Sequence, residues 1–201
     1  MTLSKHASNG VKKMEIKLAI GLGNPGPEYR NTYHNVGRLF IDHLASERAN
    51  FERRSSFEYF QLTNLLTLVK PLTFMNQSGG ATLNARKYFN SKPREILVVH
   101  DDSDLPLGSF KLSFGRGSAG HQGIESVIKS LKTNKFYRLR IGVRPPRETQ
   151  RKKANELVLK KIPVRERQIL QNLFGKLGIL YFETDGKRHL AFSPRHDPGK
   201  G

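Results

Sequence analysis

Short apolar runs alternate with longer amphipathic segments along this chain, and that alternation constrains its fold more than any other feature. Runs of strand length interleaved with runs of helix length are typical of an α/β domain. We therefore predict a single α/β domain whose mostly parallel, mixed and twisted sheet carries helices on both sides. The predicted strands are residues 15–22, 58–62, 65–70, 96–100, 110–114 and 138–143, with a turn at Thr63 and Asn64. The predicted helices are residues 36–49, 80–89, 124–131 and 165–180.

Composition limits the classes of protein that fit this chain. No apolar run approaches the roughly 20 residues that a membrane-spanning helix needs, which predicts a soluble protein. The absence of cysteine excludes a disulfide framework and a thiolate zinc site, and it fits a reducing compartment. The net charge is +18, from 35 Lys and Arg against 17 Asp and Glu. Because so many positive side chains repel one another, the excess indicates a polyanionic partner, and nucleic acid fits best.

The domain organisation follows from where composition changes. Residues 1–14 lack acidic side chains and apolar periodicity, which predicts a flexible leader. Residues 15–190 then form the α/β domain, and residues 191–201 form a basic C-terminal tail. Within the domain, residues 144–153 (RPPRETQRKK) predict a mobile, solvated basic loop, because prolines and cations cannot join a core. We expect a cytoplasmic monomer, or an organellar one if the leader directs import.

Residues 21–26 read GLGNPG, a literal match to the G-x-G-x-x-G pattern of dinucleotide-binding proteins. In those proteins a helix starts inside the glycine loop, so that its N-terminal amides face the pyrophosphate. Here Pro27 pushes Gly26 away from the helical conformation, and the next helix begins only near Val36. We therefore reject a dinucleotide site. The motif instead predicts a tight turn that places Asn24 at the carboxyl end of the sheet, where α/β proteins put their sites.

A second match, GRGSAG at residues 115–120, does run from a predicted strand into a predicted helix. Its backbone amides, with Arg116 and His121 beside them, can cradle a phosphate or a carboxylate. A glycine-rich loop without any ligand is the alternative, and the sequence leaves both open.

Chemistry requires polar side chains that converge from separate strand ends, and the sequence offers a histidine for this. His34 lies in a polar loop before a helix, and near neutral pH a histidine accepts a proton as a general base. Asp101 follows the predicted strand at 96–100 and is the natural residue to orient that base. Asp102 and Asp104 compete for the same role.

Two asparagines complete the predicted site, because the amides of Asn24 and Asn76 can donate to a developing oxyanion or position water. The run DDSD at 101–104 lacks the Gly and the distal Glu of a calcium loop, so we predict neither a metal nor another cofactor. The chain has no G-x-S-x-G motif and no cysteine. The residues therefore predict activated water attacking a carbonyl without a covalent acyl-enzyme.

Four ordered segments closely resemble the bacterial-type peptidyl-tRNA hydrolase family: GLGNPGPEYRNTYHNVG, VKPLTFMNQSG, ILVVHDDSDLPLG and RLRIGV. The resemblance covers approximately residues 17–158, with a weaker echo at 184–186. It implies a single α/β domain with a mixed sheet between helices. It also implies an activity that cleaves the ester joining a peptide to the 3′ adenosine of tRNA, with the acceptor stem and CCA end as the bound part of the tRNA.

The resemblance assigns roles to individual residues. The family's catalytic histidine falls on His34, and the aspartate that orients it falls on Asp101. The substrate-binding asparagines and the neighbouring wall residues of the cleft fall on Asn24, Asn76, Tyr29 and Met75. Of the two cations that clamp tRNA phosphate in the family, the arginine falls on Arg140. The lysine position falls on Ser113, and Lys111 can substitute from the same strand face.

Three departures from the family pattern bear on activity. The family's H-N-G is here His121-Gln122-Gly123, so an active-site amide is one methylene longer, and a displaced amide can slow a reaction. The family's R-H-N is here Tyr33-His34-Asn35, which removes one cation beside the base, and Arg144 replaces a common glycine.

Because the base, its aspartate and both asparagines are retained, we expect hydrolysis. One alternative is a non-catalytic RNA-binding relative of the organelle RNA-processing type, in which Gln122 marks lost chemistry. The other is an anion-binding protein whose loop at 115–120 holds a nucleotide.

Overall fold

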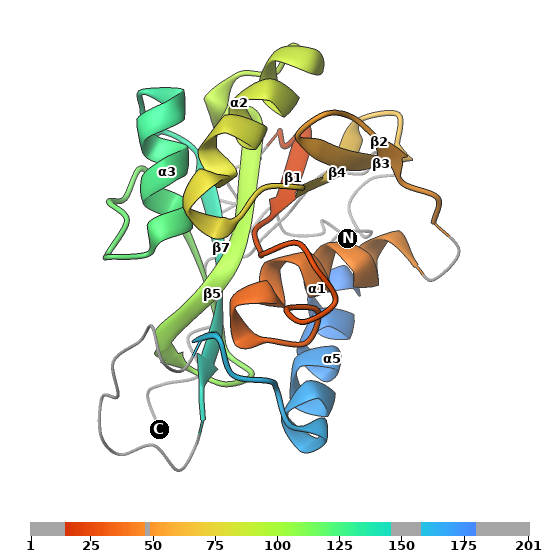
Figure 1. The fold of residues 1–201 in the computed structure, drawn as a ribbon, viewed down its shortest axis with the longest axis vertical. Coiled ribbons are helices and arrows are strands. Elements are labelled where there is room, and N and C mark those ends of the chain that lie inside the picture. Colours follow the sequence, from red (N-terminus) through yellow and green to blue (C-terminus); the bar gives the residue numbers. More distant parts are fainter. Residues whose placement is uncertain (1–14, 47–48, 146–157, 180–201) are drawn as a thin grey trace, which may run out of the picture.

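The structure, a computed structural model, describes residues 15–46, 49–145 and 158–179. Seven strands of these residues form one sheet in the order β2-β3-β4-β1-β5-β7-β6 (Figure 1). The four central strands are parallel, and β2, β3 and β6 are antiparallel to their neighbours. The strands are β1 (Leu18–Gly21), β2 (Glu52–Arg53), β3 (Phe57–Thr63), β4 (Leu66–Pro71), β5 (Ile96–Pro106), β6 (Phe110–Phe114) and β7 (Tyr137–Arg144).

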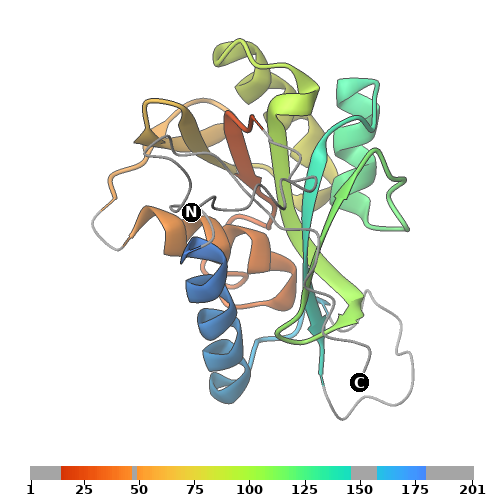
Figure 2. The same cartoon turned by 180° about the vertical axis from the view of Figure 1, so that it is seen from behind.

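Helices cover both faces of this sheet, as Figures 1 and 2 show. Helices α1 (Val36–Ala45) and α5 (Val164–Ile179) lie on one face, and α2 (Ser78–Tyr88) and α3 (Gln122–Leu131) lie on the other. Short 3₁₀ turns, η1 (Tyr33–Asn35), η2 (Met75–Gln77) and η3 (Pro93–Glu95), precede α1, α2 and β5. The predicted α/β fold with a mixed sheet between two helical layers is therefore confirmed.

The core has two halves because neighbouring residues of a strand face opposite sides of the sheet. On β1, Leu18 and Ile20 pack with α2 and α3, whereas Ala19 packs with α1 and α5. Parallel strands that are buried on both faces read as continuous apolar runs, which is why β1, β4 and β5 were recognisable in the sequence.

Several element boundaries differ from the prediction. Strand β5 does not stop at His100 but continues to Pro106, because β7 pairs with it as far as Asp102 and again at Pro106. Helix α1 ends at Ala45 and not at residue 49, since Ser46 has a φ of 68° and leaves the helical conformation. The short edge strand β2 and the three 3₁₀ turns have no apolar periodicity and were not predicted.

Some predictions fall on residues that the structure does not describe. The leader at 1–14, the tail at 191–201 and most of the basic loop at 144–153 lie outside the described ranges. Among the described residues, no helix is long and apolar enough to cross a membrane.

Candidate active site

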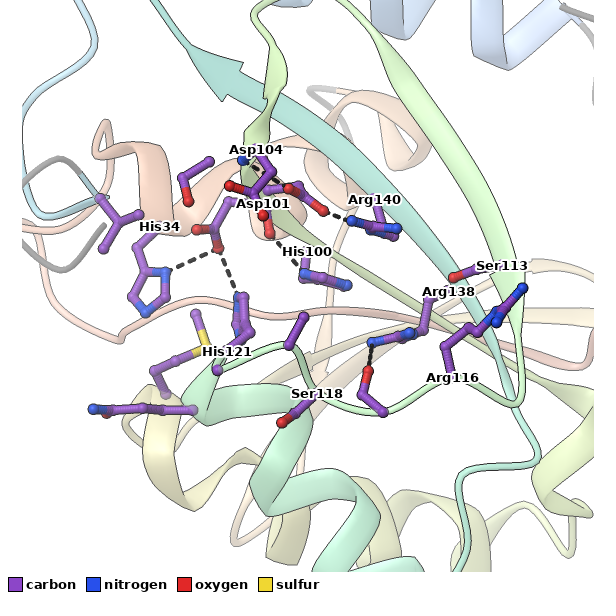
Figure 3. Close-up of a pocket in the computed structure, with 18 of the residues that line it drawn as sticks. His34, His100, Asp101, Asp104, Ser113, Arg116, Ser118, His121, Arg138 and Arg140 are labelled. Atoms are coloured by element: carbon purple, nitrogen blue, oxygen red, sulfur yellow. Dashed lines mark hydrogen bonds and ion pairs between the residues drawn. The ribbon is translucent and has the colours of Figure 1, made fainter. Parts of the chain in front are cut away.

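The predicted polar stretches meet in one cleft of about 1190 Å³ on the side of the sheet where β1 and β4 end (Figure 3). Tyr29 is outside the cleft lining, and its ring packs edge-on against the lining residue Phe74 at a centroid distance of 6.3 Å. The other predicted site residues all line the cleft: Asn24, His34, Met75, Asn76, Asp101, Lys111, Gln122 and Arg140.

A close helix contact brings His34 to Asp101. His34 lies in η1, immediately before α1, and a Cβ atom on Gly37 in the first turn of α1 would lie 2.3 Å from the carbonyl oxygen of Val99. Only glycine lets the start of α1 approach β5 so closely. As a result, Nδ1 of His34 lies 2.9 Å from Oδ1 of Asp101, which sits within β5 and not after its end as predicted.

A second histidine, His121, shares the same carboxylate oxygen. Nε2 of His121 lies 2.9 Å from Oδ1 of Asp101, while Nδ1 of His121 caps α3 by accepting the backbone N–H of Ile124 at 3.3 Å. Because Nδ1 is an acceptor there, the ring proton of His121 is on Nε2 and points at Asp101. An ionised carboxylate only accepts, so His34 also donates through Nδ1, which leaves Nε2 of His34 as the basic nitrogen.

The electrostatics of this cluster suit a general base. Burial by itself lowers the pKa of His34, but the charge and hydrogen bond of Asp101 outweigh burial, and the pKa lies above its ordinary value. Burial alone would raise the pKa of Asp101, which is 2% exposed, yet His121 and His34 hold it far below its usual range. Asp101 is therefore ionised, and His34 titrates between neutral and charged forms.

His100 is a third histidine of the cluster, and sequence reasoning gave it no role. It is fully buried, its Nδ1 donates to the backbone carbonyl of Asp101 at 2.7 Å, and its ring centroid lies 4.6 Å from that of His121. Burial, with the neighbouring His121, lowers the pKa of His100 well below its ordinary value, so it stays neutral.

The only sequence signal for His121 was its place beside Gln122 after the glycine-rich loop.

The turn at GLGNPG presents the amide of Asn24 to the cleft. Oδ1 of Asn24 accepts the backbone N–H of Met75 at 2.8 Å, while the backbone of Asn24 exchanges hydrogen bonds of 2.8 and 2.9 Å with the side chain of Asn35. Since its oxygen is occupied, Asn24 has Nδ2 available as a donor. Asn76 lies in η2 one residue beyond Met75, and Gln122 opens α3; both are exposed in the cleft.

One end of the cleft is strongly cationic, to the right of the histidines in Figure 3. Nε of Arg140 lies 2.5 Å from Oδ2 of Asp102, and Arg138 donates to the carbonyl of Gly117 at 2.9 Å. Burial, and after it the charge of the adjacent Arg140, lowers the pKa of Arg138. Lys111 and Arg116 are exposed at the same end.

Apolar side chains also line the cleft. Its lining includes Phe74, Met75, Val158 and Leu159. Phe74 and Leu159 are both large apolar side chains that are exposed to solvent. The cleft thus combines the cluster of His34, Asp101 and His121 with a cationic end and with apolar side chains in its lining.

The glycine-rich loop at 115–120 belongs to this same cleft and does not form a separate site. Its residues from Arg116 to Gly120 line the cleft that also contains His34. The loop that the nucleotide-binding alternative singled out is therefore part of the cleft at His34.

Ligand atoms of His34, Asp101 and His121 lie within 4.8 Å of one another, the spacing of a possible metal site. Coordination through these atoms requires both imidazoles to change tautomer. For His121 that change loses the cap of α3, because Nδ1 would then carry a proton toward Ile124. The hydrogen bonds therefore account for the cluster better than a cation does.

Comparison with known proteins shows the family to which this chain belongs. The family model described as peptidyl-tRNA hydrolase matches residues 18–180. The chain belongs to the peptidyl-tRNA hydrolase family. The peptidyl-tRNA hydrolase of Persephonella marina is 42% identical over 177 residues, which cover 82% of this chain and 93% of that protein. The peptidyl-tRNA hydrolase of Aquifex aeolicus is 43% identical over 142 residues, 68% of this chain and 74% of that protein.

The fold matches solved structures of the same family. The crystal structure of peptidyl-tRNA hydrolase from Acinetobacter baumannii superimposes with a TM-score of 0.72 at 29% identity, covering 85% of this chain and 90% of that one. Membership of the peptidyl-tRNA hydrolase family identifies the chain as an enzyme of the hydrolase class, which confirms the resemblance drawn from the four sequence segments.

Proposed function

We propose that this enzyme hydrolyses the ester bond between peptide and tRNA in peptidyl-tRNA, with His34 as the general base. The observation that carries the proposal is the His34–Asp101 pair, which lies in one cleft with a cationic end and with apolar side chains in its lining. A substrate with a polyanionic half and a peptide half, joined at the reacting bond, matches that arrangement. The acceptor stem of the tRNA would then bind at the cationic end of the cleft, and the peptide would bind beside the apolar side chains of the lining.

In the proposed reaction Asp101 holds the Nδ1 proton of His34, so that Nε2 removes a proton from water as the water attacks the ester carbonyl. Negative charge develops on the carbonyl oxygen, and the amides of Asn24 and Asn76 are its proposed donors. The imidazolium of His34 then returns the proton to the departing 3′ oxygen of the ribose. The products are free tRNA and free peptide, and the histidine ends neutral.

The proposed binding residues complete this picture. Lys111 and Arg140, with Arg116 and Arg138 beside them, would contact tRNA phosphates, and guanidinium groups suit phosphate geometry. Met75, Tyr29 and Phe74 would form the wall of the peptide side, and Gln122 would contact the reacting region. We further propose a cytoplasmic monomer with residues 15–190 as the catalytic domain.

The test is release of labelled peptide from an N-blocked aminoacyl-tRNA at low salt. We expect the native protein to cleave, and we expect His34→Ala to lose about 10²- to 10⁴-fold in kcat, the usual contribution of a general base. His43→Ala is the matched control, because His43 is exposed on α1 and lies outside the cleft. It should cleave at the native rate.

Gln122→Asn extends the same test to the family departure at this position. We expect it to cleave at least as fast as the native protein, because the shorter amide has one torsion fewer to order. A native protein that binds tRNA without cleaving would contradict the proposed activity. Cleavage that survives His34→Ala would contradict the base assignment.

A further inference from the structure

The three residues of η1 are each held by a different part of the molecule. Asn35 is bonded to the turn at Asn24, and His34 is bonded to Asp101 on β5. Tyr33 faces the other way, into the core under α5, and is 3% exposed. Its hydroxyl donates to Oε2 of Glu166 at 2.5 Å. The reacting histidine therefore sits between two anchored neighbours.

Glu166 is well placed to be a strong acceptor. It lies in the first turn of α5, where backbone N–H groups and the helix dipole favour a negative charge. Pro163 accepts the backbone N–H groups of Glu166 and Arg167 at 3.0 and 2.9 Å, which fixes the start of the helix. A hydroxyl that donates to a carboxylate forms one of the shorter and stronger hydrogen bonds in proteins.

The segment before α5 reinforces the same contact. The backbone N–H of Ile162 donates to Asn31 at 2.8 Å, and that of Tyr33 donates to Lys160 at 3.2 Å. Thr32 and Lys161 form an isolated antiparallel bridge between these two segments. Val158 and Leu159, at the start of this segment, line the cleft. The start of α5 is thus joined to the loop that carries His34 and to the wall of the site.

We propose that Tyr33 and Glu166 are positioning residues for His34, acting through their hydroxyl–carboxylate contact to hold η1 against Asp101. The inference rests on the proposed function, because it concerns the geometry of the proposed base. It also gives a role to Tyr33, where the sequence departs from the family's arginine. A phenol that donates to Glu166 anchors the turn without placing a cation beside the base.

A role in stability alone is the alternative, and kinetics separates the two. We expect Tyr33→Phe, which keeps the ring and removes only the hydroxyl, to lower kcat about tenfold with little change in KM, since small misplacements of catalytic groups are costly. Glu166→Ala should lower kcat equally, and the double variant should be no slower than either single one. Glu166→Gln should keep most of the native kcat, because its amide oxygen still accepts the phenol hydrogen.

The pH profile is a readout that a purely structural role would not move. Asp101 raises the pKa of His34, so loosening their contact should shift the acid limb of kcat/KM to lower pH. Glu125→Ala is the matched control, because Glu125 is likewise an acid in the first turn of a helix, α3, but is exposed. It should leave kcat and the acid limb unchanged.

Each outcome decides the proposal. Lower melting temperatures for Tyr33→Phe and Glu166→Ala, with native kcat per folded molecule and a native pH profile, would overturn it. So would a double variant whose losses multiply, or a Glu166→Gln variant as slow as Glu166→Ala. If His34→Ala is inactive while Tyr33→Phe is fully active, positioning fails and the proposed function stands. If His34→Ala is also active, the base assignment fails and the positioning proposal fails with it, whereas a native protein that does not cleave would overturn the proposed function itself.

Discussion

At the scale of single residues, the proposed chemistry depends on the proton of His34. Asp101 raises the pKa of His34. As the pH falls through that raised pKa, His34 becomes protonated and can no longer act as a base. We therefore expect kcat/KM to be constant above this pKa and to fall tenfold per pH unit below it. Asp101→Asn should lower the plateau and move the acid limb to lower pH, because the charge that raises the pKa of His34 is lost. A pH–rate profile of both proteins checks this.

Controls for this prediction lie in the same acidic run. Asp104 is exposed, and the carboxylate at 2.9 Å from Nδ1 of His34 is that of Asp101, so Asp104→Asn should leave the acid limb in place. If the acid limb of kcat/KM stays at the same pH in Asp101→Asn, a group other than His34 titrates in the reaction.

Single residues also show how far the sequence could predict this site. Asn24 and Asp101 were predictable because each follows a short apolar run, and carboxyl ends of parallel strands share one edge of a sheet. His34 was predictable because it lies in a polar loop before a helix, where a histidine is available as a base. The bond from His121 to Asp101 was not predictable. It depends on the path of the loop at 115–120, where Ala119 adopts a φ of 51° that no local pattern indicates. Tyr29 was predicted from resemblance alone and stands one side chain away from the cleft.

At the scale of elements, α2 begins two residues after the site amide of Asn76, α3 begins with Gln122, and the two helices meet without space between them. A Cβ atom on Gly79 would lie 2.0 Å from the carbonyl oxygen of Ser126, and the N–H of Gly79 donates to the Ser126 hydroxyl at 3.0 Å. Gly79→Ala should therefore force the helices apart and lower the free energy of unfolding by about 2 kcal/mol or more. Because Asn76 and Gln122 stand at the two helix starts, kcat should fall as well.

The next residue gives a matched control for this prediction. Gly80 is exposed, and a Cβ atom there would meet nothing within 4 Å. Gly80→Ala should raise the free energy of unfolding by roughly 0.5–1 kcal/mol, because alanine favours the helix interior. Urea unfolding of both variants measures the difference. Equal effects at the two positions would show that the contact with Ser126 does not limit the approach of the helices.

The same scale shows where elements escaped prediction. Residues 101–106 read as a polar loop, yet they extend β5, because pairing with β7 satisfies their backbone. Such pairing is a tertiary effect that overrides local composition. Strand β6 was predicted to the residue, since its apolar and polar side chains alternate between two clear breaks.

At the scale of the whole molecule, the fold shows where part of the net charge of +18 is concentrated. Cations gather at one end of the cleft, where Asp102 is the carboxylate paired with Arg140. Binding of a polyanion at that end releases counterions, so its affinity should fall steeply as salt rises. The sequence predicted the partner class from net charge, but only the sheet order brings β5, β6 and β7 together at this end.

Lys111 provides the sharpest test of this arrangement, because it is exposed on β6 and lines the cleft. If it contacts a tRNA phosphate, Lys111→Gln should raise KM, leave kcat nearly unchanged and reduce the slope of log affinity against log salt by about 1. Lys17→Gln is the matched control: Lys17 precedes the central strand β1, lies outside the cleft lining and pairs with Glu95 at 3.1 Å. Both variants lose one positive charge. Lys17→Gln should nevertheless leave the salt slope unchanged, because Lys17 lies outside the cleft. Equal slopes for the two variants would mean that net charge, and not the cleft, attracts the tRNA.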